Sequence, residues 1–180
     1  MIKYLVFVIA IFTVGCKEPE ARRPITVQSG TFINESVARN KALNEKENAL
    51  INNYIKQQNS TYITSENGFW YTYDAKIETD TLPTPKFGDV VTYNCSIKTL
   101  NGNIIYSEED LKTQTYTIDQ EELFTGLREG LKLMKPGETV TFLFPSQKAY
   151  GYYGDDNKID TNTPIICQVT LNTITKSNTQ

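Results

Sequence analysis

The sequence predicts an α+β domain in which an antiparallel sheet wraps around one short helix. Three observations lead to this class. Short β-rich runs separated by turn residues follow one another between residues 69 and 174. One short stretch among them, beginning at Leu123, has helical periodicity. A longer polar helical segment comes before the strands instead of alternating with them.

Composition narrows the classes of function. The chain has 180 residues, 22% charged and 39% hydrophobic, which is typical of one domain with appendages. A net charge of -3 gives no electrostatic reason to expect nucleic acid as a partner. The absence of histidine excludes His-based acid–base chemistry and Ser-His or Cys-His nucleophiles. Three cysteines without CxxC spacing argue against structural zinc, so we expect no metal and no cofactor.

Residues 1–15 are expected to form a signal peptide for export. One early lysine is followed by an apolar run, Leu5 to Phe12, that is too short to span a bilayer comfortably. Thr13-Val14-Gly15-Cys16 resembles a bacterial lipobox, with Thr where Leu is usual. Cleavage before Cys16 and its lipidation would anchor the protein in a membrane of the cell envelope, facing the periplasm or the cell surface. The alternative is plain secretion with an incidental thiol at Cys16.

Two appendages follow. Residues 16–31 are polar and contain Pro19, Pro24 and Gly30, which predicts a flexible tether. Residues 32–60 are expected to contain a helix capped by Asn34 or Ser36. Its apolar stripe is too thin for a coiled-coil seam, so packing on the following domain is favoured over a dimerisation or partner helix. The stripe consists of Val37, Leu43, Leu50, Ile51, Tyr54 and Ile55, with Glu35, Glu45 and Glu47 mixed among lysines.

The predicted domain, residues 61–176, begins with several strands. The aromatic run Phe69–Tyr73 and the long run Val90–Leu100 are β-rich. Asn101-Gly102 is a strong hairpin signal and leads into Ile104–Tyr106. Thr115–Ile118 is a further strand. The acidic residues 108–110 are expected to be a solvated charge run.

The helical stretch and the segments after it complete the domain. Its apolar positions are Leu123, Phe124, Leu127, Leu131 and Met134, at helical spacing. Asp119 is a candidate cap, and Lys135-Pro136-Gly137-Glu138 ends the helix. Residues 140–144 and 163–174 are predicted strands. The acidic loop 151–157 lacks the spacing of a calcium loop and is expected to be solvated.

Six motifs, spaced in this order, resemble those of an FKBP-type peptidyl-prolyl isomerase domain, over about residues 68 to 174. The resemblance implies a shallow apolar groove that accepts a proline ring and needs no nucleophile or metal. The X–Pro amide has a rotation barrier of about 20 kcal/mol, and a dry pocket that favours the twisted amide lowers it. The motifs are Gly68-Phe69-Trp70-Tyr71, Gly88-Asp89-Val90-Val91, Asn101-Gly102, Phe124-Thr125-Gly126-Leu127-Arg128-Glu129-Gly130, Met134-Lys135-Pro136-Gly137-Glu138, and Pro145 through Tyr150-Gly151.

The resemblance also implies the residues of the groove. Tyr150 matches a tyrosine that donates to a substrate carbonyl, and Leu123 and Phe124 match two apolar residues before the helix. Ile105 falls where the family usually has Phe. Tyr106 falls where it usually has Asp. Leu127 takes the place of a tryptophan at the pocket floor.

Two cysteines also fall at pocket positions of the family. Cys95 takes the place of a tyrosine and Cys167 that of a phenylalanine, on strands that the family fold makes neighbours. In an exported protein they are a candidate disulfide. The alternative is two buried free thiols that act as small hydrophobes.

Two functions follow from the resemblance. The first is a lipid-anchored isomerase that assists folding of exported, proline-containing polypeptides. The second is a non-catalytic chaperone or assembly factor that uses an altered groove. A lipobox, a helical segment and one such domain are together similar to lipoproteins associated with gliding motility, which implies gliding or secretion machinery as a further partner.

Overall fold

The computed structural model describes residues 29–79 and 81–177. The expected signal peptide, Cys16 and most of the expected tether lie outside the described residues. The chain divides into two units, one through Val37 and one from Ala38 onward. Within the described ranges, no helix has the length and apolar character needed to cross a membrane.

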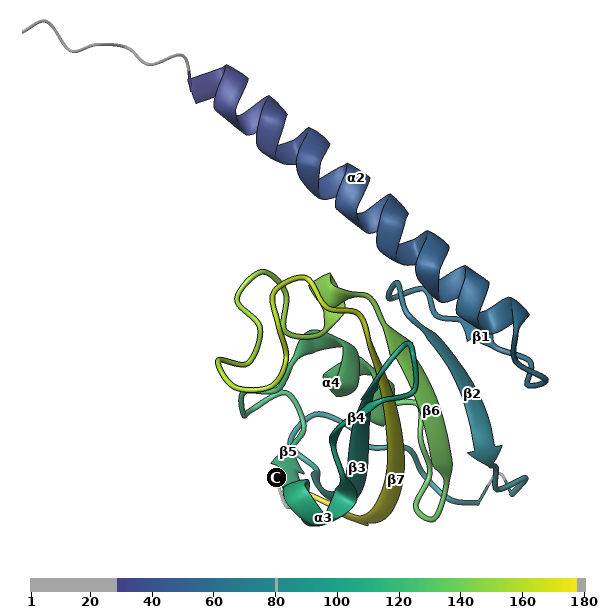
Figure 1. Cartoon of the computed structure of the whole chain (residues 1–180). Coiled ribbons are helices and arrows are strands. Elements are labelled where there is room, and N and C mark those ends of the chain that lie inside the picture. Colours follow the sequence, from purple (N-terminus) through teal and green to yellow (C-terminus); the bar gives the residue numbers. More distant parts are fainter. Residues whose placement is uncertain (1–28, 80, 178–180) are drawn as a thin grey trace, which may run out of the picture. The chain divides into compact units, whose positions relative to one another are not determined.

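The predicted α+β fold is confirmed. Seven strands form an antiparallel sheet in the order β1-β2-β6-β7-β3-β4, and β5 pairs with β3 off this path. Figure 1 shows the strands side by side with α4 against them. The elements are α2 (Ser29–Lys56), β1 (Ile63–Thr64), β2 (Trp70–Ala75), β3 (Val90–Thr99), β4 (Ile104–Tyr106), α3 (Glu108–Leu111), β5 (Gln114–Thr117), α4 (Thr125–Leu131), β6 (Thr139–Phe144), the 3₁₀ helix η1 (Ser146–Lys148) and β7 (Ile165–Thr175).

Strand β3 pairs with three other strands of the sheet. It pairs with β7 along its whole length, from Val90 to Thr99. On its other edge it pairs with β5 near its start and with β4 near its end. The expected hairpin between β3 and β4 is present, and Gly102 adopts the positive φ (85°) that glycine tolerates best.

The single core helix lies directly on two aromatic rings of β6. Phe142 and Phe144 stack with centroids 5.4 Å apart and planes 9° from parallel. A Cβ on Gly126 would lie 2.5 Å from the Phe144 ring, and one on Gly130 would lie 2.9 Å from the Phe142 ring. Because the two glycines are one turn apart, the face of α4 that they form can approach the rings closely.

The opposite face of the sheet is covered by part of α2. Since side chains alternate along a strand, Leu143 points away from Phe142 and Phe144. Leu143 and Ile166 form a small buried cluster with Ile51 of the helix, and Tyr54 and Ile55 pack around it. Packing of this helix on the domain was the favoured alternative, and it is what the structure shows from Leu43 onward.

Contrary to the prediction, two residues of the apolar stripe are exposed. Val37 is 60% exposed and Leu50 is 46% exposed, whereas Glu47 is buried. The helix also begins at Ser29, so neither Asn34 nor Ser36 is its cap, and the last residues assigned to the tether are helical. Buried polar contacts with distant residues, which periodicity does not reveal, decide which face of the helix is covered.

The caps of the two short helices also differ from expectation. Phe124, not Asp119, occupies the N-cap position of α4 and makes no side-chain cap bond. The acidic residues 108–110 belong to α3, where the side chains of Ser107 and Asp110 form a capping box. The Ser-x-x-Asp spacing is typical of a helix start, but the charge pattern by itself indicates only a solvated charge run.

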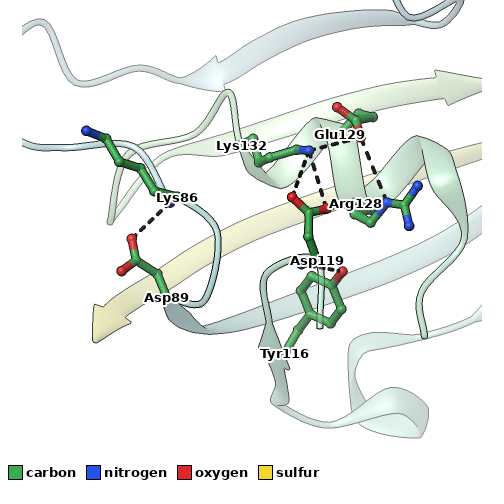
Figure 2. Close-up of polar contacts among 7 residues, drawn as sticks. All are labelled: Lys86, Asp89, Tyr116, Asp119, Arg128, Glu129 and Lys132. Atoms are coloured by element: carbon green, nitrogen blue, oxygen red, sulfur yellow. Dashed lines mark hydrogen bonds and ion pairs between the residues drawn. The ribbon is translucent and has the colours of Figure 1, made fainter. Parts of the chain in front are cut away.

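Asp119 instead organises a polar network that supports the loop leading into α4 (Figure 2). Its backbone φ is 58°, and its N–H donates to the Tyr116 hydroxyl. Its carboxylate accepts a bond from Lys132 at 3.2 Å and lies 3.5 Å from the Arg128 Nε atom. Glu129 joins the same network through Lys132. The network therefore ties the strand before the loop to the helix after it.

Candidate functional site

A small apolar cavity lies between β3, α4 and the loop after η1. Its volume is about 120 Å³, which is of the size of a small ring. An open depression of about 580 Å³ shares three of its lining residues, Leu123, Phe124 and Tyr150. The cavity is lined by Tyr93, Cys95, Ile97, Leu111, Gln114, Leu123, Phe124, Leu127 and Tyr150.

One wall of the cavity consists of residues that the sequence predicted. Phe124 and Leu123 come from the loop before α4, and Leu127 comes from the helix itself, where it is buried. The Phe124 ring packs edge-on against Phe144, with centroids 5.5 Å apart. The Tyr150 ring tilts onto Phe124 at 5.1 Å. A continuous run of aromatic contacts therefore holds this wall against the core.

The Tyr150 hydroxyl is the polar group of that wall. Burial raises the pKa of Tyr150 above its ordinary value of 10.0, and the nearby Cys167 and Asp155 raise it further. The phenol therefore stays protonated at physiological pH and can donate a hydrogen bond. In a cavity with apolar walls, such a donor orients a bound carbonyl group.

The floor of the cavity is formed by alternate residues of β3. Tyr93, Cys95 and Ile97 share one face of the strand, because side chains alternate along it, and all three are buried. Tyr93 supplies an aromatic ring two positions from the site where Cys95 replaces the family tyrosine. Four lining residues were not predicted from the sequence: Tyr93, Ile97, Leu111 and Gln114. Tyr93 and Ile97 could have been found, because they lie two positions before and after Cys95 and therefore on the same face of the strand.

The expected disulfide is not formed. Cys95 and Cys167 are both free and buried. The strand register pairs Cys95 with Val169 and Cys167 with Ile97, so the two cysteines are diagonal neighbours. The hydrogen bond with Cys95 and burial raise the pKa of Cys167, which keeps that thiol protonated. The structure has the alternative, two buried free thiols.

The remaining two predicted residues do not line the cavity. Ile105 packs against the hydrophobic core from β4. Tyr106 also packs there, and its hydroxyl donates a short hydrogen bond to the Asp155 carboxylate. The same hydroxyl accepts a bond from Asn157 at 3.0 Å. Tyr106 therefore connects β4 with the acidic loop instead of forming the wall.

Asp155 organises that loop from within. Its Oδ1 atom accepts backbone N–H bonds from Asn157, Lys158 and Ile159 at 3.0, 2.9 and 2.7 Å. Burial would raise the pKa of Asp155, but the bond from Tyr106 and the backbone bonds outweigh it and lower that pKa. The loop expected to be a solvated segment therefore carries an ionised carboxylate close enough to Tyr150 to affect its titration.

This geometry suits binding and orientation more than covalent chemistry. The cavity has mostly apolar walls, two phenols, those of Tyr93 and Tyr150, and no nucleophile paired with a base. In the part of the chain that the structure describes, no group of three or more His, Cys, Asp or Glu side chains is arranged to hold a metal ion. A compact apolar ring next to a carbonyl group fits these features.

Comparisons with known proteins agree with this geometry. The family of FKBP-type peptidyl-prolyl cis-trans isomerases matches residues 83–172, which include every residue that lines the cavity. A peptidyl-prolyl cis-trans isomerase from Pseudomonas syringae pv. tomato str. DC3000 is similar in structure, with a TM-score of 0.60 and 20% identity, over 76% of this chain and 96% of that chain. FkpA from Escherichia coli has a TM-score of 0.59 and 22% identity, over 96% of this chain and 81% of that chain.

Proposed function

The chain belongs to the FKBP-type peptidyl-prolyl cis-trans isomerase family, and from that premise we propose that it catalyses rotation about X–Pro bonds in exported polypeptides. The observation that supports this most is the 120 Å³ apolar cavity with the Tyr150 phenol in its wall. A proline ring enters the cavity, and the carbonyl of the preceding residue meets the phenol.

Catalysis depends on the relative stability of the planar and the twisted amide inside the cavity. The planar amide is stabilised by resonance that separates charge, and water favours that separation. Leu123, Phe124 and Leu127 exclude water from the proline ring and from the bond next to it. Without water to stabilise the planar, more polar amide, the free-energy difference between the planar and the twisted amide becomes smaller. Tyr150 holds the carbonyl while the other side of the bond rotates. Since the amide bond is only rotated, the reaction needs neither a nucleophile nor a proton donor with a pKa near 7.

The direct test is an isomerisation assay with a proline-containing peptide and the full chain. We expect acceleration over the uncatalysed rate, with kcat/KM reduced about tenfold by Tyr150→Phe and more by Phe124→Ala. Tyr152→Phe is the matched control, because Tyr152 lies in the same loop and is 69% exposed. A rate equal to that of buffer at high protein concentration would rule out this activity.

A non-catalytic chaperone or assembly factor is the second candidate. It is favoured by the smaller side chains of Cys95 and Leu127, which stand where the family usually has tyrosine and tryptophan. A groove altered in this way retains apolar surface for holding a chain. Suppression of client aggregation that persists in Tyr150→Phe, together with no isomerase rate, would select this function over the first.

The cellular setting is also part of the proposal. Lipidation of Cys16 would anchor the protein in the cell envelope, facing the periplasm or the cell surface, near exported clients. The gliding or secretion apparatus is the proposed machinery it serves. These points are supported by the N-terminal sequence pattern and the similarity to gliding-associated lipoproteins. Labelled fatty acid incorporated into the wild-type chain but not into Cys16→Ala is the expected result, and equal labelling of both would contradict the anchor.

A further inference from the structure

We infer that Glu47 of α2 is a positioning residue for the loop that carries Tyr150. This inference rests on the proposed isomerase function and deepens it. It also gives the helix a role, although Glu47 lies outside the residues 83–172 that match the family. The helix and the loop meet at Ser146, the first residue of η1, which begins directly after β6.

The contact is a buried carboxylate with two donors. Glu47 is 2% exposed, as is Ser146. Its Oε2 atom accepts the Ser146 backbone N–H at 2.7 Å, and its Oε1 atom accepts the Ser146 hydroxyl, also at 2.7 Å. Both bonds have the short length typical of a charged acceptor. A buried carboxylate is strongly disfavoured without such partners, so this pair fixes one relative position of helix and loop.

Backbone hydrogen bonds connect Ser146 with the residues on both sides of Tyr150. The Ser146 carbonyl accepts the N–H of Ala149 at 2.9 Å and that of Gly151 at 2.8 Å. These two donors flank Tyr150 in the sequence. The Gly151 carbonyl in turn accepts the N–H of Asn162 at 2.8 Å. The backbone on both sides of Tyr150 is therefore anchored to the residue that Glu47 holds.

The helix itself is anchored next to this contact. Ile51 lies one turn after Glu47 and is fully buried against Leu143 and Ile166. Leu143 lies in β6, the strand that leads into Ser146. Glu47 is therefore held on a fixed element, and it can transmit that fixed position to the loop.

The Tyr150 hydroxyl must meet a carbonyl within a narrow range of positions. A displacement of about 1 Å at a catalytic group can reduce a rate by roughly a hundredfold. A loop held at Ser146 by two bonds keeps the hydroxyl in place. Loss of the Glu47 contact should therefore lower kcat more than it raises KM, because the apolar wall formed by Phe124 and Leu127 stays in place.

The test measures activity and local exchange in the full chain. In Glu47→Ala we expect kcat/KM to fall about tenfold, mainly through kcat. Amide hydrogen exchange at Ala149 and Gly151 should speed up about tenfold, while exchange at Val140 and Phe142 in β6 stays the same. Glu47→Gln, which keeps one strong acceptor, should fall between the wild type and Glu47→Ala. Glu45→Ala, an exposed site on the same helix, is the matched control and should change nothing.

The measurements distinguish a failure of the isomerase function from a failure of the positioning role of Glu47. An inactive wild type with faster exchange at Ala149 and Gly151 in Glu47→Ala would contradict the isomerase but support the positioning. An active wild type with unchanged kcat/KM and unchanged loop exchange in Glu47→Ala would overturn the inference. Faster exchange throughout β6 would show a general loss of stability and would overturn it as well. Should Glu47→Ala not fold, Ser146→Ala removes one of the two bonds and should change the same loop signals in the same direction, but less.

Discussion

The two sides of the cavity are built in different ways. Leu123, Phe124, Leu127 and Tyr150 belong to one stretch of chain, from the loop before α4 to the loop after η1. The facing side is formed by Tyr93, Cys95 and Ile97 of β3. The Tyr106–Asp155 contact, between β4 and the acidic loop, lies outside the lining of the cavity. By the resemblance to the family, Leu123, Phe124 and Tyr150 on the first side match the expected residues, and Leu127 differs. The other positions at which the residue differs from the expected one are Cys95, Tyr106 and Cys167.

The difference shows how a site keeps its chemistry when individual residues change. The aromatic surface absent at Cys95 is supplied by Tyr93 on the same face of the same strand. At Tyr106 the side chain is a phenol, and its hydroxyl donates a hydrogen bond to the Asp155 carboxylate. The cavity floor therefore still contains an aromatic ring, from another position of the same strand.

The largest effect should come from the side that keeps the family pattern. Gly126→Ala places a methyl group 2.5 Å from the Phe144 ring and 2.7 Å from the Lys148 carbonyl. Neither neighbour can move without displacing the wall, so we expect a loss of about 3 kcal/mol in the free energy of unfolding, measured by urea denaturation. Thr125→Ala, at an exposed neighbouring position, is the control. A change below about 0.5 kcal/mol for Gly126→Ala would contradict the close packing of α4 on β6.

The next effect tests whether Tyr93 replaces the lost aromatic surface. Tyr93→Val removes the ring from the cavity floor, and we expect kcat/KM for a proline peptide to fall about tenfold. Tyr93→Phe keeps the ring and loses only the hydroxyl, so it should lose clearly less activity than Tyr93→Val. Equal losses in the two variants would show that the hydroxyl, not the ring, is what the floor contributes.

A smaller effect should come from the acidic loop. Asp155→Asn keeps the shape of the side chain but removes the charge that receives the Tyr106 hydroxyl and three backbone donors. We expect kcat/KM to fall about threefold, because hydrogen bonds to a charged acceptor are stronger than those to a neutral one. Asp156→Asn is the control, since Asp156 is exposed and asparagine tolerates its positive φ of 58°. A fall in kcat/KM as large as that of Tyr93→Val would show that the acidic loop contributes as much to activity as the ring on the cavity floor.

The smallest effect is a dependence of stability on pH. The pKa of Asp155 is lower in the folded protein than its ordinary value of 3.8, so the folded state favours the ionised form. Its contribution is present above pH 3.8 and is lost as pH falls through the lowered value. Between pH 6 and pH 2.5 we expect the wild type to lose more stability than Asp155→Asn, measured by thermal unfolding. Parallel curves for the two proteins would indicate that the carboxylate adds nothing to the fold.

Local sequence signals predicted most of the fold. The hairpin at Asn101-Gly102, the long strand β3 and the turn after α4 depend on residues next to one another in the chain, and each was found where it was expected. The start of α2, the cap of α4 and helix α3 were not found or were wrong. The cap of α4 is Phe124, which makes no side-chain cap bond, so a search for capping side chains could not find it. The capping box of α3 lies within a short acidic run, where the charge pattern alone predicts no helix.

The sequence by itself therefore determined the class of fold and the positions of most strands along the chain and, through the family resemblance, indicated the residues of the wall that carries Tyr150. The tertiary structure alone decided which distant groups meet. Glu47 reaches Ser146 across 99 positions, and Tyr106 reaches Asp155 across 49. The register of β3 and β7 also decided that Cys95 and Cys167 lie diagonally and are not bridged. The physical reason is that periodicity reports which face a residue occupies, whereas a buried carboxylate, a short hydrogen bond or a disulfide depends on the position of its partner to within about an ångström.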